Sequence, residues 1–233
     1  YTGTATNNSS ANSMPILRRT LVIPAGATLT VDRNVAGWNY IDVEGAGILQ
    51  NEGTLNFTNS VGYNAPIYFY APTGVAGTLN NYGTIYVNMG TANANGYVDA
   101  GLLYSNSIKL VNTNGTIKTD NASVADNKST WQQGDSATIS GAVDFDKGAR
   151  LVGTTTIAAS TVAKRFSLYA GTLTGSADLL ITDSFSWYSG IMSGTGITQI
   201  GTSATSYIYT GTATNNSSAN SMPILRRTLV IPA

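Results

Sequence analysis

The sequence predicts an all-β chain that folds as a right-handed parallel β-solenoid, a β-helix with rungs of about 19 to 32 residues. Three observations carry this prediction: short repeated blocks, segments that alternate apolar and polar residues as strands do, and Gly or Asn between those segments. Blocks of this length cannot bury a hydrophobic face alone, so successive copies must stack on one another. An antiparallel sandwich would also give many short strands, but not repeats that retain corner glycines.

The predicted strands are rich in β-branched and aromatic residues and are bounded by Gly, Asn or Pro. In these strands we expect Leu, Ile, Val and Phe to face inward. Corners would take Gly and Asn because the chain turns there with positive φ. Identical residues would lie above one another, so asparagine and aromatic stacks would connect the rungs. In chain order, the clearest predicted strands are 20–23, 28–31, 40–43, 67–70, 84–87 and 178–181.

Two families of internal repeat set the expected rung length. Residues 166–176 align with residues 185–195 at an offset of 19, retaining Phe, Ser, Tyr and both glycines. Residues 47–57 align with residues 77–87 at an offset of 30, and a weaker copy at 110–119 follows at an offset of 32. The first half therefore predicts long rungs and the second half tight ones, with a boundary near residues 119–130.

A longer repeat joins the two ends of the sequence. Residues 1–25 recur without change as residues 209–233, at an offset of 208. We interpret residues 1–233 as a single solenoid, one 208-residue unit of a tandem array plus a 25-residue overlap. A designed copy of one end onto the other is the alternative.

The ends of a solenoid expose unpaired strand edges. The repeat therefore predicts end-to-end continuity with copies of the same chain. The candidate residues of this joint are Tyr1, Met14, Arg18, Arg19, Tyr209, Arg226 and Arg227.

Composition excludes several classes of function. The sequence has no Cys and no His, which removes disulfides, thiolate chemistry and His-based catalysis or metal binding. Twelve basic residues balance twelve acidic ones, so nucleic-acid binding has little electrostatic support. No apolar run is long enough to span a membrane in this segment. Only 10% of residues are charged, so we expect a surface of hydroxyls and amides suited to an extracellular, cell-surface location.

The rung sequences resemble those of a known group of proteins. The runs at 23–31, 51–57 and 185–196 look like rungs of repetitive bacterial surface and secreted β-helix proteins, which include filamentous-haemagglutinin-like adhesins and autotransporter passengers. The resemblance covers most of residues 15–208 and is generic. It implies a right-handed β-helix, export, and a surface role in adhesion, aggregation or envelope structure. It carries over no catalytic residue.

The function expected from these features is that of a non-enzymatic extracellular structural protein, a repeat unit of a fibre, sheath or stalk. The alternative is an adhesin whose solenoid binds glycans or cell-surface proteins. Exposed aromatic rings can stack on sugars. The candidate glycan-contact aromatics are Trp38, Tyr63, Tyr68 and Tyr70.

A polysaccharide lyase or glycosidase is the less favoured third hypothesis. Glycosidases place two carboxylates about 5–10 Å apart, and two pairs have a spacing that fits one strand face. These pairs are Asp42 with Glu44 and Asp144 with Asp146, for which solvent-facing strand positions are the simpler interpretation. The acids Asp120, Asp126 and Asp135 could form one calcium site but are better interpreted as solvated loop charges. We expect no catalytic residue, no metal and no cofactor.

Overall fold

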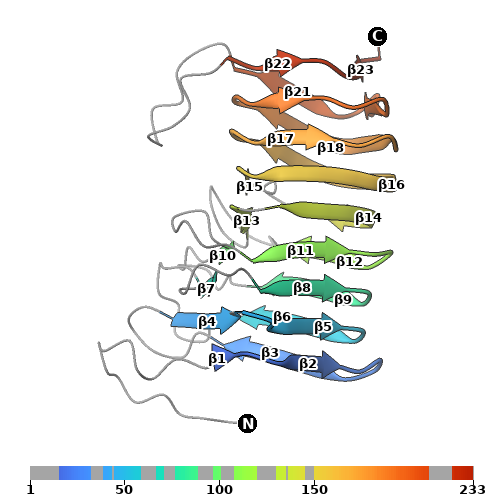
Figure 1. Ribbon diagram of the computed structural model, residues 1–233. Coiled ribbons are helices and arrows are strands. Elements are labelled where there is room, and N and C mark those ends of the chain that lie inside the picture. Colours follow the sequence, from blue (N-terminus) through green and yellow to red (C-terminus); the bar gives the residue numbers. More distant parts are fainter. Residues whose placement is uncertain are drawn as a thin grey trace.

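The computed structural model is a stack of β-rungs, with the first described strand, β1, at one end and the last, β23, at the other (Figure 1). All regular secondary structure in the described residues is β-strand, and every strand pairing is parallel. The predicted parallel β-solenoid is thereby confirmed. The described residues are 16–32, 39–43, 45–58, 67–70, 77–88, 97–100, 108–119, 130–134, 136–144, 150–209 and 222–232.

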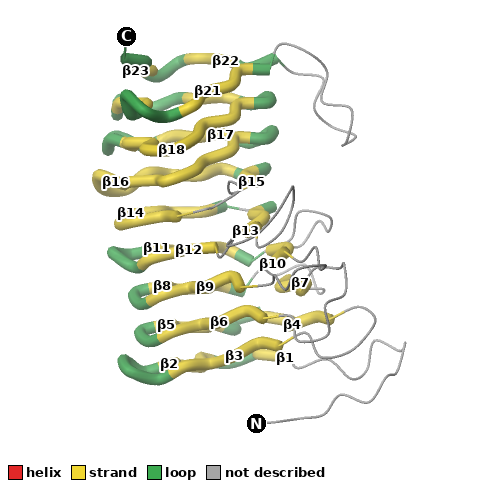
Figure 2. Tube along the Cα trace, turned by 180° about the vertical axis from the view of Figure 1, so that it is seen from behind, coloured by secondary structure: helices red, strands yellow, loops and turns green. Residues whose placement is uncertain are grey.

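Each rung supplies one strand segment to each of three parallel sheets. Figure 2 shows the same stack of rungs from behind. The first sheet consists of β1 (Ile16–Leu17), β4 (Asn39–Val43), β7 (Ile67–Tyr70), β10 (Tyr97–Ala100), β13 (Thr130–Gln133), β15 (Arg150–Leu151), the last part of β16 (Thr154–Leu168), the last part of β18 (Leu179–Trp187), and β21 (Thr205–Ile208).

The second sheet follows the first along the chain in every rung. It consists of β2 (Thr20–Ile23), β5 (Ile48–Asn51), β8 (Thr78–Asn81), β11 (Lys109–Asn112), the first part of β14 (Ala137–Asp144), the first part of β16, β17 (Thr172–Thr174), β19 (Ile191–Met192) and β22 (Ile224–Leu225).

The third sheet completes each rung. It consists of β3 (Thr28–Asp32), β6 (Thr54–Thr58), β9 (Thr84–Asn88), β12 (Thr116–Thr119), the last part of β14, the middle of β16, the first part of β18, β20 (Ile197–Ile200) and β23 (Thr228–Val230). In the described residues, the three sheets together make nine rungs.

Rung length changes along the stack as the two repeat families predict. Asn51 bonds Asn81 across 30 residues, and Asn81 bonds Asn112 across 31. In the second half, Phe166 faces Phe185, and Asp178 accepts a hydrogen bond from the backbone of Ile197, 19 residues further on. The same three sheets continue across the expected boundary, because β10, β11 and β12 pair with strands on its far side.

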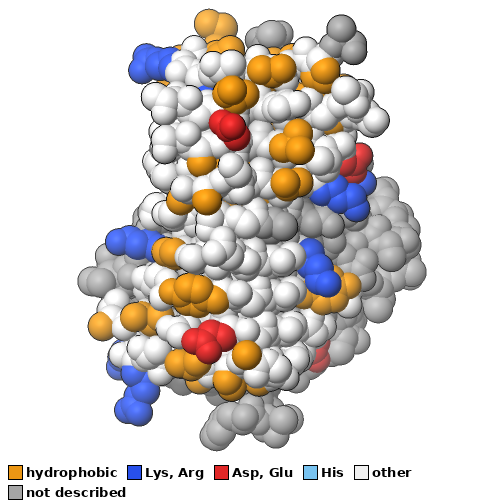
Figure 3. Space-filling model, turned by 90° about the vertical axis from the view of Figure 1, so that its right-hand side faces the viewer, with side chains coloured by type: hydrophobic (Ala, Val, Ile, Leu, Met, Phe, Trp, Pro, Cys, Tyr) orange, Lys and Arg blue, Asp and Glu red, His pale blue; other side chains and the backbone are white. Residues whose placement is uncertain are grey.

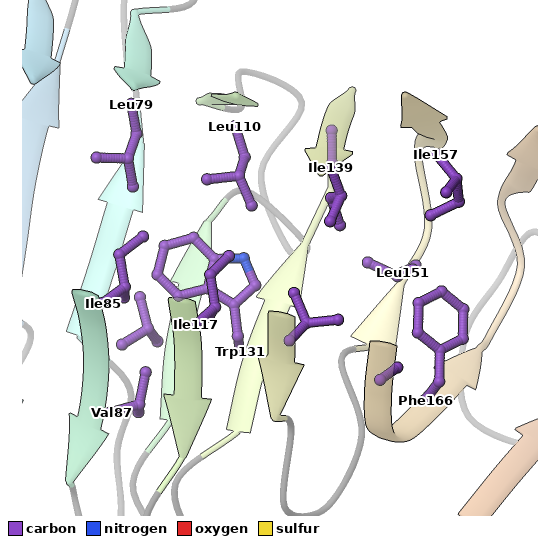
Figure 4. Packing of buried hydrophobic residues seen from close by; sticks show 14 of the residues in the cluster. Leu79, Ile85, Val87, Leu110, Ile117, Trp131, Ile139, Leu151, Ile157 and Phe166 are labelled. Carbon is purple, nitrogen blue, oxygen red and sulfur yellow. The ribbon is translucent and has the colours of Figure 1, made fainter. Parts of the chain in front are cut away.

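The core is a single apolar column inside the three sheets. Buried and less buried residues alternate along the strands, as in Thr54–Thr58, so Leu55 and Phe57 face inward and are completely buried. Figure 4 shows inward residues from successive rungs packing beside one another. Trp131 and Phe166 are among the largest of these buried side chains. Burial of this continuous column supplies the main stabilisation of the stack.

A ladder of buried asparagines lies at one corner of the long rungs. Asn51 Nδ2 donates to Asn81 Oδ1 at 2.7 Å, and Asn81 Nδ2 donates to Asn112 Oδ1 at 2.5 Å. The ladder ends at Asn112, whose Nδ2 donates to the backbone carbonyls of Gly115 and Ser140. The predicted asparagine stack is thus present, and it gives partners to side-chain N–H donors that burial would otherwise leave unsatisfied.

The corner glycines have two different physical causes. Gly190 and Gly194 have φ of 89° and 90°, as the sequence argument expects. Gly83 is required for another reason: an added Cβ would lie 2.2 Å from the Gly53 carbonyl oxygen of the preceding rung. Close rung stacking, rather than positive φ alone, therefore explains the corner glycines. The corner between β11 and β12, in the fourth rung, has one extra residue and includes Asn114 at φ 55°, which accounts for the offset of 32 in that repeat.

The surface carries few charges, and those visible on the face in Figure 3 are scattered. Lys118 lies over the Tyr86 ring at 4.8 Å from its centroid, and Arg165 forms an ion pair with Asp183. No helix in the described part of the chain is both long enough and apolar enough to cross a membrane.

Candidate functional site: the repeated segment and its seat

The C-terminal copy of the repeated segment supplies two strands, β22 and β23, to the last described rung of the stack. Ile224 and Leu225 of β22 pair with Ile191 and Met192 of β19, while β23 pairs with β20. The Ile224 amide donates to the Gly190 carbonyl at 2.9 Å, and the Arg226 amide donates to the Met192 carbonyl at 2.7 Å. The copy is therefore seated by the same backbone ladder that joins the other rungs.

The N-terminal copy is built into the opposite end of the stack. Its residues Ile16 and Leu17 pair with Asp42 and Val43, and its strand β2 pairs with β5. The same sequence thus pairs with the following rung in its N-terminal copy and with the preceding rung in its C-terminal copy.

Arg227 anchors the C-terminal copy. Its side chain is 4% exposed, and all its bonds go to the two preceding rungs. Nε donates to Thr198 Oγ1 at 3.0 Å and Nη1 to the Gly175 carbonyl at 3.0 Å, with a longer bond to the Ser193 carbonyl. Nη2 donates to the carbonyls of Ala177 and Ile197 at 2.6 and 3.3 Å.

The chain shapes this arginine pocket with small residues and one acid. An added Cβ at Gly196 would lie 2.7 Å from Arg227 Nη2, so glycine leaves the space that the guanidinium occupies. Burial lowers the pKa of the Arg227 guanidinium from its ordinary value, and the Asp178 carboxylate opposes that shift by favouring the charged form. Five donors directed at four backbone carbonyls and one hydroxyl make the pocket specific for a planar guanidinium.

The same segment begins with a stacked tyrosine. Tyr209 lies on Tyr188 with ring centroids 4.2 Å apart and an interplanar angle of 7°, and Tyr188 contacts Tyr169 of the rung before at 5.1 Å. Burial, followed by the hydrogen bond and negative charge of Tyr209, raises the pKa of Tyr188 to about 12. The segment is therefore held at two points, by Tyr209 and by Arg227.

The predicted joint residues differ sharply in their surroundings. Arg18, Arg19 and Arg226 are exposed, whereas Arg227 is buried. Tyr209 is 40% exposed and stacked, and Tyr1 and Met14 lie outside the described residues. The sequence marks both arginine pairs but gives no signal that distinguishes Arg227, because its pocket is assembled from residues 175–198 in two other rungs.

The candidate glycan-contact residues do not form an exposed aromatic cluster in the described part of the chain. Tyr68 is 3% exposed, although the register places its neighbour Phe69 on the inward face, so its ring is not presented for stacking on a sugar. Tyr70 ends β7, and the structure gives no description of its side chain. Trp38 and Tyr63 lie outside the described residues, and their role in glycan binding stays a prediction.

The candidate carboxylate pairs are not brought into a describable site. Asp42 is 4% exposed within β4, whereas Glu44 and Asp146 lie outside the described residues and the side chain of Asp144 is not described. Asp120, Asp126 and Asp135 also lie outside them. Among the residues that are described, no three potential ligands gather as a metal site would require.

The fold defines the class of the protein as a parallel β-solenoid. Searches against protein-family models, curated proteins and solved structures found no match.

Proposed function

We propose that this protein is a non-enzymatic structural component of an extracellular fibre, sheath or stalk, in which each unit continues into the next through the repeated segment. The observation that carries the proposal is the double placement of that segment. One copy extends the stack beyond β19 and β20, and the other copy begins a stack below β4 and β5.

The inward side chains of the segment fit both neighbours. Leu225 covers Met192 and is 51% exposed, since no other strand of the described residues pairs with β22. Its counterpart Leu17 packs under the completely buried Val43. Combining the two placements puts this leucine between Met192 and Val43. The equivalent combination puts Leu21, the counterpart of Leu229, between Thr198 and Leu49, both of which are buried.

The surface chemistry suits an architectural role. Hydroxyl and amide groups change little with pH or salt, and only 10% of the residues are charged. With about 4.8 Å per stacked rung, each unit would extend a fibre by roughly 40 Å.

A chain of two units tests the proposal directly. It consists of residues 1–233 followed by a second copy of residues 26–233, and its particles are imaged by negative-stain electron microscopy. We expect straight rods about twice as long as those of the 233-residue chain. Two short rods joined at variable angles would show that the segment is a flexible linker, and the proposal would then be wrong.

An equivalent two-unit chain with the first Arg227→Ala serves to locate the joint. The matched control is Arg226→Ala, because Arg226 is the exposed neighbour. Bending at the middle of the rod is expected for the first variant and not for the second.

A further inference from the structure

The two copies of the repeated segment occupy different sheets. In the N-terminal copy, Ile16–Leu17 belongs to the first sheet and Thr20–Ile23 to the second. In the C-terminal copy, the equivalent Ile224–Leu225 belongs to the second sheet, and Thr228–Val230 belongs to the third. The same residues have therefore moved on by one sheet, which is one third of a turn of the chain.

We infer that successive units of this protein join with an offset of one sheet, so that each unit is turned by about a third of a turn about the solenoid axis relative to the unit before it. This inference rests on the proposed function, because it specifies the geometry of the same joint. The first sheet of one unit would stack on the second sheet of the preceding unit. One unit then comprises eight full turns and a third.

The inward face of the segment is the same in both positions. Leu17 and Leu225 pair with Val43 and Met192, which are completely buried. Leu21 and Leu229 pair with Leu49 and Thr198, which are at most 3% exposed. A shift by one sheet therefore keeps both inward leucines of the segment against the core. A shift of register by one residue would instead turn them to solvent.

The linker before the C-terminal strands also favours this offset. Ile208 ends a strand of the first sheet and Ile224 begins one of the second, so residues 209–223 connect neighbouring sheets. An unrotated joint would require Ile224 in the first sheet, directly above Ile208. The second and third sheets would then receive no strand in that turn.

The offset assigns a partner to the remaining edge at the C-terminal end. Among the described strands, β21 pairs with β18 alone, and its residues Tyr207 and Ile208 are 53% and 45% exposed. The strand that follows the segment is Thr28–Asp32, where Leu29 and Val31 are half-buried between exposed residues. Residues 28–32 of the next unit would cover β21, with Leu29 and Val31 above Ser206 and Ile208.

A fibre built this way has a recognisable symmetry. Any feature on one sheet of a unit reappears on a different side of the fibre in the next unit, and the original orientation returns at the fourth. The unit repeat of roughly 40 Å is accompanied by a full repeat of roughly 120 Å.

Disulfide trapping in the two-unit chain tests the offset, and the absence of native Cys keeps the background clean. The first variant combines Tyr207→Cys in unit one with Thr30→Cys in unit two. The second variant combines Tyr207→Cys in unit one with Thr28→Cys in unit two, which allows for a register shift of two residues. The control variants replace Tyr207→Cys by Gln199→Cys, which an unrotated joint would bring beside residues 28–32. Gln199→Cys with Val230→Cys in the 233-residue chain reports cysteine reactivity, since these two residues are register partners.

We expect near-complete disulfide formation between position 207 and position 28 or 30, and less than about a tenth as much from position 199. Trapping from position 199 in straight rods would overturn the offset while leaving the proposed function intact. Straight rods with no trapping from either position, while the register control oxidises, would overturn it equally. Bent particles would instead refute the proposed function.

Discussion

At the scale of single residues, polar side chains set which rungs can be neighbours. Asn51, Asn81 and Asn112 are at most 1% exposed, and the side-chain amide of each donates a hydrogen bond to the next rung. Arg227 also joins rungs, but in the opposite direction: its guanidinium donates hydrogen bonds to the two preceding rungs. Apolar residues would tolerate several stackings, but these groups have few positions in which every donor is satisfied.

The centre of the ladder should be its most sensitive position. Asn81→Ala removes the acceptor of Asn51 and a donor to Asn112, so we expect the free energy of unfolding to fall by about 2–4 kcal/mol. Asn80→Ala is the matched control, because Asn80 is only half-buried and alternates with the inward residues. Urea unfolding followed by circular dichroism measures both, and equal losses would contradict the role of the ladder.

The arginine pocket predicts a local effect at the C-terminal rung. Arg227→Ala removes five hydrogen bonds, and we expect the amides of residues 224–230 to exchange about 10- to 100-fold faster. Hydrogen-exchange mass spectrometry measures this directly. Arg226→Ala should leave the rates within about twofold, since Arg226 is exposed; comparable acceleration in both variants would argue against the pocket.

At the scale of strands and corners, the sequence predicts most of what is seen, because each rung repeats one local rule. The alternation in 28–31 and 84–87, and the alignment of Phe166 with Phe185, follow from inward and outward positions. Tyr68 fails that rule: it alternates with Phe69 and is nevertheless buried. Burial on the outer face of a sheet depends on what lies against that face, which alternation alone does not encode.

The stability of the C-terminal rungs should depend on alkaline pH, because Tyr169, Tyr188 and Tyr209 stack on one another there. The pKa of Tyr188 is raised from 10.0 to about 12, first by burial, so the unfolded chain ionises before the folded one. The contribution is therefore complete below about pH 10 and is lost as the pH rises toward about 12. We expect Tyr188→Phe to flatten the fall in unfolding midpoint between pH 9.5 and about 12. An unchanged fall would show that other groups cause it.

At the scale of the whole molecule, the sheet that the repeated segment enters lies beyond local sequence patterns. The repeat of residues 1–25 predicts that two ends are related, but the segment suits any of the three sheets, because all share the same inward alternation. The rungs beneath it decide its position. Ile224 follows the first-sheet strand β21 and therefore enters the second sheet, whereas Ile16 begins a first-sheet strand.

If one unit continues into the next as an unbroken solenoid, hydrogen exchange at β21 must change when a second unit follows. In the 233-residue chain, β21 has one described strand neighbour, so its amides should exchange unevenly and some rapidly. In the two-unit chain, we expect the amides of residues 205–208 of the first unit to become at least about 10-fold more protected from exchange. Unchanged exchange at these residues would mean that no strand covers them and that the solenoid stops at the joint.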